Sequence, residues 1–326
     1  MSRAAGACLL AAAVALVATA AWLGTRDPLG SLPADDPAAV AVLEERPEAW
    51  HGRTLLHVAL EGPSVGRVRF VVSLPDPLPP RGIPLVVILG GLGGGSNSIR
   101  QISQVAGDPG PNAFVGYDWP LPAREPGVAE IVRRAPEYRR DVLSVPGQVD
   151  AILAWATQRA WADPGRVSLL GFSLGAFVVP AAQRIAQEHG VAIRWTALAY
   201  AGAPIGDVIA GHPGAGPRWV RPVLGAGADL LLGPVEPSNH LPHLRGRFLV
   251  LGAASDRLIA RAPAERIVAL TPEPRTVVLI EGDHMGVGTE RWKLLARVVD
   301  VTRAWLLEQG AIDPPSPQPA RGPPVP

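Results

Sequence analysis

Short apolar runs alternate with amphipathic segments along most of the chain. Runs that end at glycine or polar residues predict strands of a buried sheet, and they lie at 67–74, 84–89, 113–117, 166–170, 197–200, 247–251 and 276–280. Segments with the apolar period of a helix lie at 139–159, 174–188, 262–270 and 290–309. Because strands alternating with helices form mostly parallel sheets, the pattern predicts an α/β fold with helices on both faces of a central sheet.

One long segment interrupts this alternation. Residues 203–245 contain seven prolines and show no clear period. A segment of that length without its own structure inside a compact domain is usually a binding loop or a lid. We therefore predict a lid-like insertion at 203–245 within a domain that spans 51–310.

The N-terminus has the pattern of a targeting segment, which we place at 1–23. Residues 4–23 carry no charge, and Ala18-Thr19-Ala20 fits the small-x-small pattern of a signal-peptidase site. Twenty residues of helix also measure about 30 Å, enough to span a bilayer. Three interpretations stay open: a signal peptide cleaved after Ala20, a retained membrane anchor, and a buried alanine-rich helix. The first two predict a periplasmic, secreted or membrane-anchored protein.

The regions flanking the domain differ from it in composition. Residues 24–50 are rich in Asp, Glu, Pro and Ala, which indicates a linker. Residues 311–326 contain seven prolines, and proline is excluded from helix interiors and central strands. We expect an extended, disordered tail at 311–326.

Composition and charge exclude several classes of protein. The 326 residues include 30 Lys and Arg against 29 Asp and Glu, a net charge of +1, without a basic run that would indicate nucleic-acid binding. With 48% hydrophobic residues the chain is not an intrinsically disordered one. A single cysteine, Cys8, allows neither an internal disulfide nor a thiolate metal cluster. No metal-ligand spacing such as H-E-x-x-H occurs, and we expect neither a metal nor an organic cofactor.

Gly171-Phe172-Ser173-Leu174-Gly175 is a G-x-S-x-G motif. Chance alone gives about 0.16 such matches in a chain of this composition, so the motif needs supporting context. The context is a predicted strand before it and a predicted helix after it, as a nucleophile elbow requires. The tight turn demands glycines on both sides of the serine. Ser173 is therefore the predicted nucleophile.

A serine hydroxyl needs a base, and the base needs an orienting carboxylate. The chain has seven histidines, at 51, 57, 189, 212, 240, 243 and 284. With a nucleophile elbow, the order along the chain is serine, acid, histidine. His284, which follows a predicted strand in a glycine-flanked loop, is the predicted base. Asp256, at the end of the preceding strand, is the predicted acid. Asp207 is the second candidate, whereas Asp283 is adjacent to His284 in sequence and poorly aimed at its ring.

The oxyanion of acyl transfer requires preorganised N–H donors. One is expected from Leu174, directly after the nucleophile. The other is expected from the glycine-rich loop 90–96, which follows a predicted strand and lets backbone approach a ligand. That loop lacks the G-K-[ST] of a phosphate-binding loop, and the chain lacks a dinucleotide fingerprint, which argues against a nucleotide site.

These motifs resemble the α/β-hydrolase family, in the family's order: PLVVILGGLGGG, DPGRVSLLGFSLGA, FLVLGAASDRLI and VVLIEGDHMGV. The resemblance spans about 68–307. It implies an α/β-hydrolase fold, a Ser173–Asp256–His284 triad, and oxyanion donors at Leu174 and, by position, Leu92. The family often has His-Gly where this chain has Gly90-Gly91, which makes Leu92 the less firmly placed donor.

The resulting hypothesis is an exported serine hydrolase that acts on carboxylic esters of a small-molecule acyl substrate. Other acyl-transfer enzymes with the same triad, namely a thioesterase, a peptidase or an acyltransferase, stay open. So does a non-catalytic envelope protein that keeps the fold for binding. Trp119 and Trp219 are candidates for lining an acyl pocket, although such a residue is more often simply a packed aromatic. Membrane association through the N-terminal segment is expected if it is retained.

Overall fold

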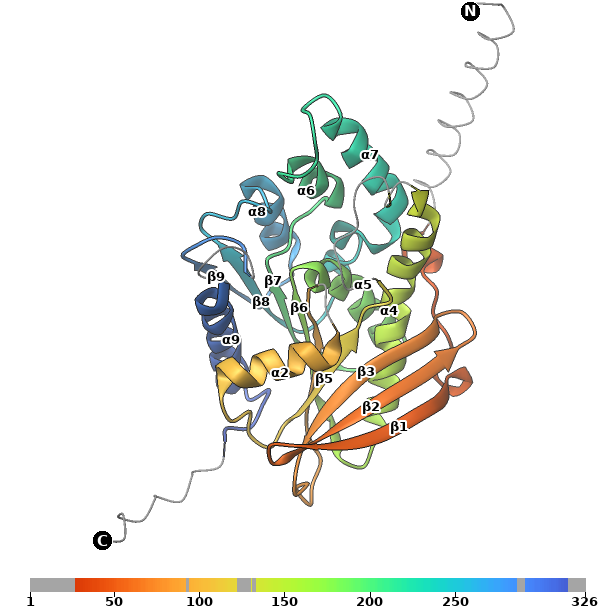
Figure 1. Ribbon diagram of the computed structural model, residues 1–326, viewed down its shortest axis with the longest axis vertical. Coiled ribbons are helices and arrows are strands. Elements are labelled where there is room, and N and C mark those ends of the chain that lie inside the picture. Colours follow the sequence, from red (N-terminus) through yellow and green to blue (C-terminus); the bar gives the residue numbers. More distant parts are fainter. Residues whose placement is uncertain (1–26, 92–93, 122–129, 131–132, 286–290, 316–326) are drawn as a thin grey trace, which may run out of the picture.

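In the described residues, a nine-stranded sheet forms the centre of the molecule (Figure 1). The computed structural model describes residues 27–91, 94–121, 130, 133–285 and 291–315. The strands are β1 (Ala41–Trp50), β2 (Arg53–Gly62), β3 (Gly66–Pro75), β4 (Ile83–Leu89), β5 (Ala113–Asp118), β6 (Ala162–Phe172), β7 (Ile193–Ala199), β8 (Arg247–Ala253) and β9 (Arg275–Ile280). Their order in the sheet is β1-β2-β3-β5-β4-β6-β7-β8-β9. The pairs from β1 to β5 are antiparallel, and those from β5 to β9 are parallel.

Helices cover both faces of this sheet. They are α2 (Gly95–Ala106), α4 (Ala135–Thr157), α5 (Leu174–Glu188), α6 (Ile205–Gly211), α7 (Arg221–Leu232), α8 (Arg261–Leu270) and α9 (Arg291–Glu308). The strand β4 shows how the layers form, because its alternate side chains point to opposite faces. Leu85, Val87 and Leu89 pack in one cluster with α4 and α5, whereas Val86 and Ile88 pack in another with α9. The predicted α/β architecture is thus confirmed.

The most strongly patterned elements lie where the sequence predicts them. The apolar run at 84–89 is the fully buried β4, and the helix predicted at 174–188 has the bounds of α5. The helix predicted at 139–159 begins four residues earlier, and α4 continues through Pro146. In the described part of the chain, no helix combines the length and the hydropathy needed to cross a membrane. The targeting segment predicted at 1–23 lies outside the described residues.

The prediction of a linker at 24–50 is wrong for residues 41–50. Residues 41–50 form β1, which pairs with β2 through a hairpin in which His51 and Gly52 have φ of 46° and 71°. The strand is an edge strand that exposes most of its side chains. Its charged composition therefore resembles that of a linker, although its backbone is bonded to β2. The domain begins before residue 51.

Two further boundaries differ from the prediction. Ala311 and Ile312 are buried, and Asp313 pairs with Arg166 at 2.7 Å, so the predicted tail at 311–326 starts inside the domain. The insertion at 203–245 has its own helices, α6 and α7, followed by short 3-10 helices. The residues of α7 that are buried are the small Gly225 and Ala228, which is why no apolar stripe marks this helix. The polar helix α2 and the strand β2 were not predicted.

Candidate active site

The turn between β6 and α5 is a nucleophile elbow. Ser173 has φ 52° and ψ −117°, a conformation that side chains rarely adopt. A Cβ atom on Gly175 would lie 2.0 Å from the carbonyl oxygen of Leu89 in β4. A Cβ atom on Gly171 would lie 2.7 Å from the Cα atom of Ala176. Both glycines of the motif are therefore required by close backbone contacts, and the elbow presents the serine above the sheet.

The structure brings the three predicted catalytic residues into one hydrogen-bonded chain. Ser173 Oγ lies 2.9 Å from His284 Nε2, and His284 Nδ1 lies 2.9 Å from Asp256 Oδ2. The other carboxylate oxygen of Asp256 accepts hydrogen bonds from the N–H groups of Leu258 and Ile259, at 2.8 and 2.9 Å. The imidazole is buried. This geometry lets the imidazole accept the serine proton while the fixed carboxylate holds its orientation.

The alternative carboxylates do not reach the imidazole. Asp207 is exposed in the first turn of α6. Asp283 instead pairs with the Arg257 guanidinium and accepts hydrogen bonds from the backbone N–H groups of Arg257 and His284. Partial burial raises the pKa of Asp283, but these donors outweigh it and lower the pKa overall. Asp283 thus fixes the loop that carries His284 rather than the ring itself.

Backbone donors for an oxyanion are available at the elbow. Leu174 is the first residue of α5, and the first N–H groups of a helix have no partner within it. The N–H of Ser173 is bonded to Ala199 O at 2.8 Å, so it is not free to act. Leu92, the second predicted donor, lies outside the described residues. Leu174 is the donor that the geometry supports.

Two consecutive residues at the carboxyl end of β5, Asp118 and Trp119, hold the ends of the glycine-rich loop. The carboxylate of Asp118 accepts a hydrogen bond from Gly95 N. The indole of Trp119 donates to Gly90 O at 3.2 Å, with its ring buried against Tyr117. Trp119 is thus a packed aromatic that positions backbone, whereas Trp219 lies 80% exposed on the surface. Neither observation places these rings in an acyl pocket.

Tyr200 is a site residue that the sequence patterns did not indicate. It follows β7 with φ 61°, and its ring lies edge-on to the His284 imidazole, with 5.1 Å between centroids. The ring is buried, and its hydroxyl has no hydrogen-bond partner in the described structure. Burial, followed by the charges of Asp256 and Asp283, raises the pKa of Tyr200 to about 12. Strained residues of this kind concentrate at functional sites.

The contact predicts that the Tyr200 ring, not its hydroxyl, positions His284. Tyr200→Phe keeps the ring and should leave kcat and KM near wild type, with stability unchanged or raised by about 1 kcal/mol, because an unpartnered buried hydroxyl is removed. Tyr200→Leu should lower kcat by about tenfold, through a displaced imidazole, with little change in KM. Steady-state kinetics and thermal unfolding of both variants test this. Equal losses of kcat in the two variants would contradict it.

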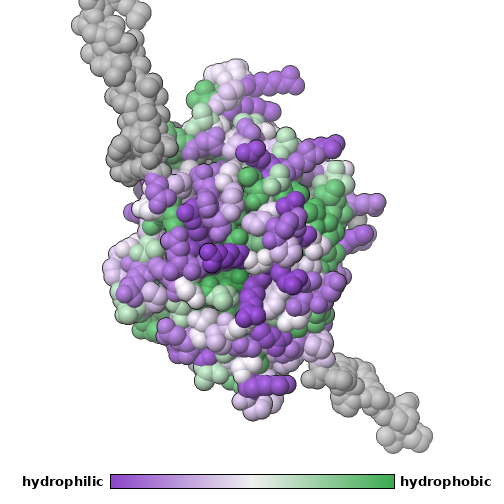
Figure 2. All heavy atoms as spheres, turned by 180° about the vertical axis from the view of Figure 1, so that it is seen from behind, coloured by the Kyte–Doolittle hydropathy of each residue, from purple (hydrophilic) through white to green (hydrophobic). Residues whose placement is uncertain are grey.

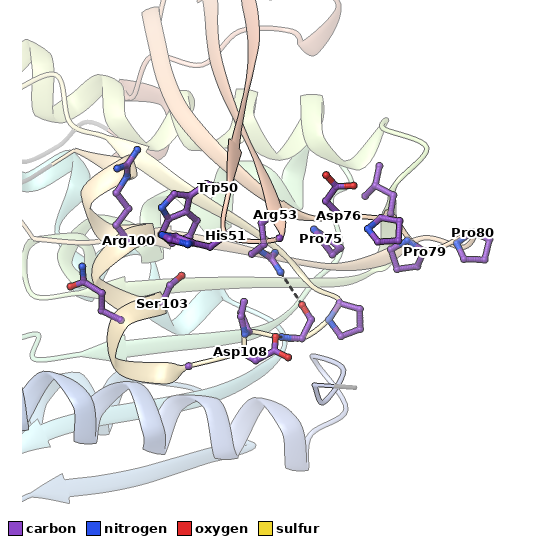
Figure 3. Close-up of a pocket in the computed structure, with 18 residues that line it drawn as sticks. Trp50, His51, Arg53, Pro75, Asp76, Pro79, Pro80, Arg100, Ser103 and Asp108 are labelled. Atoms are coloured by element: carbon purple, nitrogen blue, oxygen red, sulfur yellow. Dashed lines mark hydrogen bonds between the residues drawn. The ribbon is translucent and has the colours of Figure 1, made fainter. Parts of the chain in front are cut away.

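A cavity of about 1080 Å³ lies at the amino ends of β4 and β5, whereas Ser173 follows the carboxyl end of β6. Figure 3 shows Trp50, His51 and Asp108 around it, between the β1–β2 turn and the segment that leads into β5. Arg53 also lines the cavity, but its guanidinium donates hydrogen bonds to Ser73, Gly110 and Asn112. Because Ser173, Asp256 and His284 follow the carboxyl ends of their strands, this cavity is separate from the candidate active site.

No protein-family model and no curated protein matches the sequence. Solved structures share the fold at low identity. Acetyl xylan esterase 1 of Thermoanaerobacterium sp. JW/SL YS485 is 12% identical over 86% of this chain and 90% of its own, with a TM-score of 0.59. The acetyl xylan esterase of Paenibacillus sp. R4 is 15% identical over 84% and 90%, with a TM-score of 0.56. A 2,6-dihydroxy-pseudo-oxynicotine hydrolase is 17% identical over 84% and 70%, with a TM-score of 0.53.

These similarities and the sheet order define the fold. The chain has the α/β-hydrolase fold, as its motifs predict. At such low identity the similarity identifies the fold alone, and the reaction has to be argued from the side chains of the site. The site is a serine, a histidine and an aspartate at the carboxyl ends of three parallel strands.

Proposed function

We propose that the protein is a serine hydrolase that cleaves carboxylic esters through an acyl-enzyme at Ser173. The observation that carries the proposal is the hydrogen-bonded chain from Ser173 through His284 to Asp256, with 2.9 Å at each link. The strained backbone of Ser173 supports it, because a binding protein has no need to hold a serine in that conformation. A non-catalytic role is therefore the weaker hypothesis.

The geometry supports the following role for each residue. Ser173 Oγ attacks the acyl carbon while His284 Nε2 takes the hydroxyl proton. Asp256, held by two backbone N–H groups, keeps the tautomer in which Nδ1 carries a proton and stabilises the imidazolium. The N–H of Leu174 stabilises the oxyanion, and the start of α5 favours that negative charge. His284 then protonates the leaving alcohol and activates the water that releases the acid.

The choice of esters over other acyl substrates rests on the similar structures rather than on the triad. Two of the similar structures are acetyl xylan esterases, whereas a third is a hydrolase of 2,6-dihydroxy-pseudo-oxynicotine. A serine nucleophile fits esters, thioesters and amides alike. Esters remain the substrate class we propose, and thioesterase, peptidase and acyltransferase activities are the alternatives that an assay must compare.

A covalent probe tests the proposed nucleophile directly. The full-length chain and its Ser173→Ala variant are treated with a fluorophosphonate, and the labelled peptide is identified by mass spectrometry. We expect one label, on Ser173, and none on the variant, with hydrolysis of short-chain p-nitrophenyl esters in the wild type only. Thioester and anilide substrates assayed alongside rank the acyl classes. A folded wild type that takes no label and cleaves none of these substrates would refute the proposal.

We further propose that the protein is exported and that residues 4–23 either direct cleavage after Ala20 or remain as a membrane anchor. The support is the uncharged apolar run and its small-x-small motif. Intact-mass measurement of the protein from a membrane fraction and from the surrounding medium separates the two cases. A full-length chain in the cytoplasmic soluble fraction would contradict export.

A further inference from the structure

The two edges of the sheet differ in chemistry. Unpaired edge strands invite pairing with another chain, and charged residues or proline on the edge prevent it. The strand β1 carries both kinds of protection, since it reads AVLEERPEAW. At the other edge, β9 reads RTVVLI and has neither a charge nor a proline between Arg275 and Glu281. One edge strand is protected, and the other, β9, has no strand beside its free side among the described residues.

The side chains of β9 show which face is uncovered. Val278 and Ile280 pack in the cluster that contains α9. Val277 and Leu279 therefore point to the opposite face, where they are 43% and 68% exposed. Figure 2 views the molecule from that side and shows hydrophobic surface toward the margin at which β9 lies. An exposed apolar pair on an unprotected edge strand is a surface that pairing with another strand would bury.

The sequence of β9 is complementary to itself. If two copies pair antiparallel about a two-fold axis at Val278, each Val277 lies opposite the partner's Leu279, and each Arg275 lies opposite the partner's Glu281. Arg275, Val277 and Leu279 fall on one face of the strand because they are two residues apart, and Glu281 directly follows the last residue of β9. On this face Val277 and Leu279 then face apolar residues of the partner. Arg275, which also contacts Glu273 and the carbonyl oxygen of Thr271 within its own chain, faces a carboxylate. Such cross-strand pairs stabilise antiparallel strands. No other register that is centred on a residue of β9 pairs Arg275 with Glu281.

We propose that β9 is a dimerisation edge, at which a second copy of this chain extends the sheet by antiparallel pairing centred on Val278. The interface is isologous, as two-fold dimers require. Backbone hydrogen bonds between the two β9 strands continue the sheet, and Val277 and Leu279 of both copies form one apolar cluster. Because the two β9 strands run antiparallel, the carboxyl ends of the parallel strands point in opposite directions in the two copies. The two Ser173 sites therefore open on opposite sides of the dimer.

The mass of the full-length protein in solution, measured by sedimentation equilibrium in a mild detergent over a range of concentrations, tests this. We expect the wild type to be a dimer and Leu279→Lys to shift it to monomer, because the charge would enter the apolar cluster. Leu43→Lys is the matched control, since Leu43 is 49% exposed on the opposite edge strand β1. It should leave the dimer intact. A monomeric wild type, or a dimer that Leu43→Lys dissociates and Leu279→Lys does not, would overturn the proposal.

Two further variants test the register, including the case in which Leu279→Lys does not fold. Glu281→Arg should weaken the dimer by placing like charges opposite each other, and adding Arg275→Glu should restore it. In a Cys8→Ser background, Val278→Cys should form an intermolecular disulfide under mild oxidation, because the two copies of residue 278 face each other at the axis. Leu43→Cys should not. Absence of charge rescue together with absence of the Val278→Cys cross-link would overturn the pairing.

Discussion

Replacing Ser173 by alanine is expected to lower kcat for a carboxylic ester by about 10⁵–10⁶-fold, and adding His284→Ala is expected to lower it no further. The two side chains act as one unit, since His284 Nε2 is within 2.9 Å of the hydroxyl that it activates. Once the hydroxyl is gone, the imidazole has no proton to take. The remaining rate comes from the oxyanion donor at Leu174 and from substrate binding.

The measurement is a double-mutant cycle on kcat with one p-nitrophenyl ester. Ser173→Ala, His284→Ala and the double variant are compared with the wild type, with near-equal losses expected in all three. Circular dichroism and thermal unfolding check that each variant is folded. Losses that multiply in the double variant would show that the two residues act independently, and would contradict the assigned mechanism.

The candidate catalytic residues could be brought together from the sequence because each follows a strand with a strong apolar signal. β6, β8 and β9 end just before Ser173, Asp256 and His284, and parallel strands bring their carboxyl ends to one edge of a sheet. Strand order was not needed for this inference. The chain order serine, acid, histidine then selected among seven histidines.

Other features depend on tertiary contacts that no local pattern reveals. The strand β1 exposes most of its side chains, so its pairing with β2 leaves no alternation in the sequence. Tyr200 contacts His284 only because β7 and the loop after β9 end at the same edge. Asp118 and Trp119 hold a loop that lies more than twenty residues earlier in the chain. A single sequence contains no signal for such pairs, whereas the glycine motif indicated its own turn.

The largest effect on stability is expected from Gly175→Ala. An added Cβ atom would lie 2.0 Å from the carbonyl oxygen and 2.7 Å from the Cβ atom of Leu89. Both atoms belong to β4, a central strand that is buried along its whole length, so neither can move aside as a flexible side chain would. Relief requires α5 to shift away from the sheet. We expect a loss of more than about 4 kcal/mol in the free energy of unfolding, the range of severe core disruption.

Gly227→Ala is the matched control, because Gly227 also lies within a helix, α7, and has nothing within 4 Å of the added atom. There, alanine should raise the free energy of unfolding by up to about 1 kcal/mol through helix propensity. Urea unfolding of both variants, with soluble yield as a second readout, separates the steric effect from a general effect of the substitution. A Gly175→Ala variant as stable as the wild type would show that α5 can retreat from β4. The backbone N–H of Leu174 would then not be fixed rigidly enough to serve as a preorganised oxyanion donor.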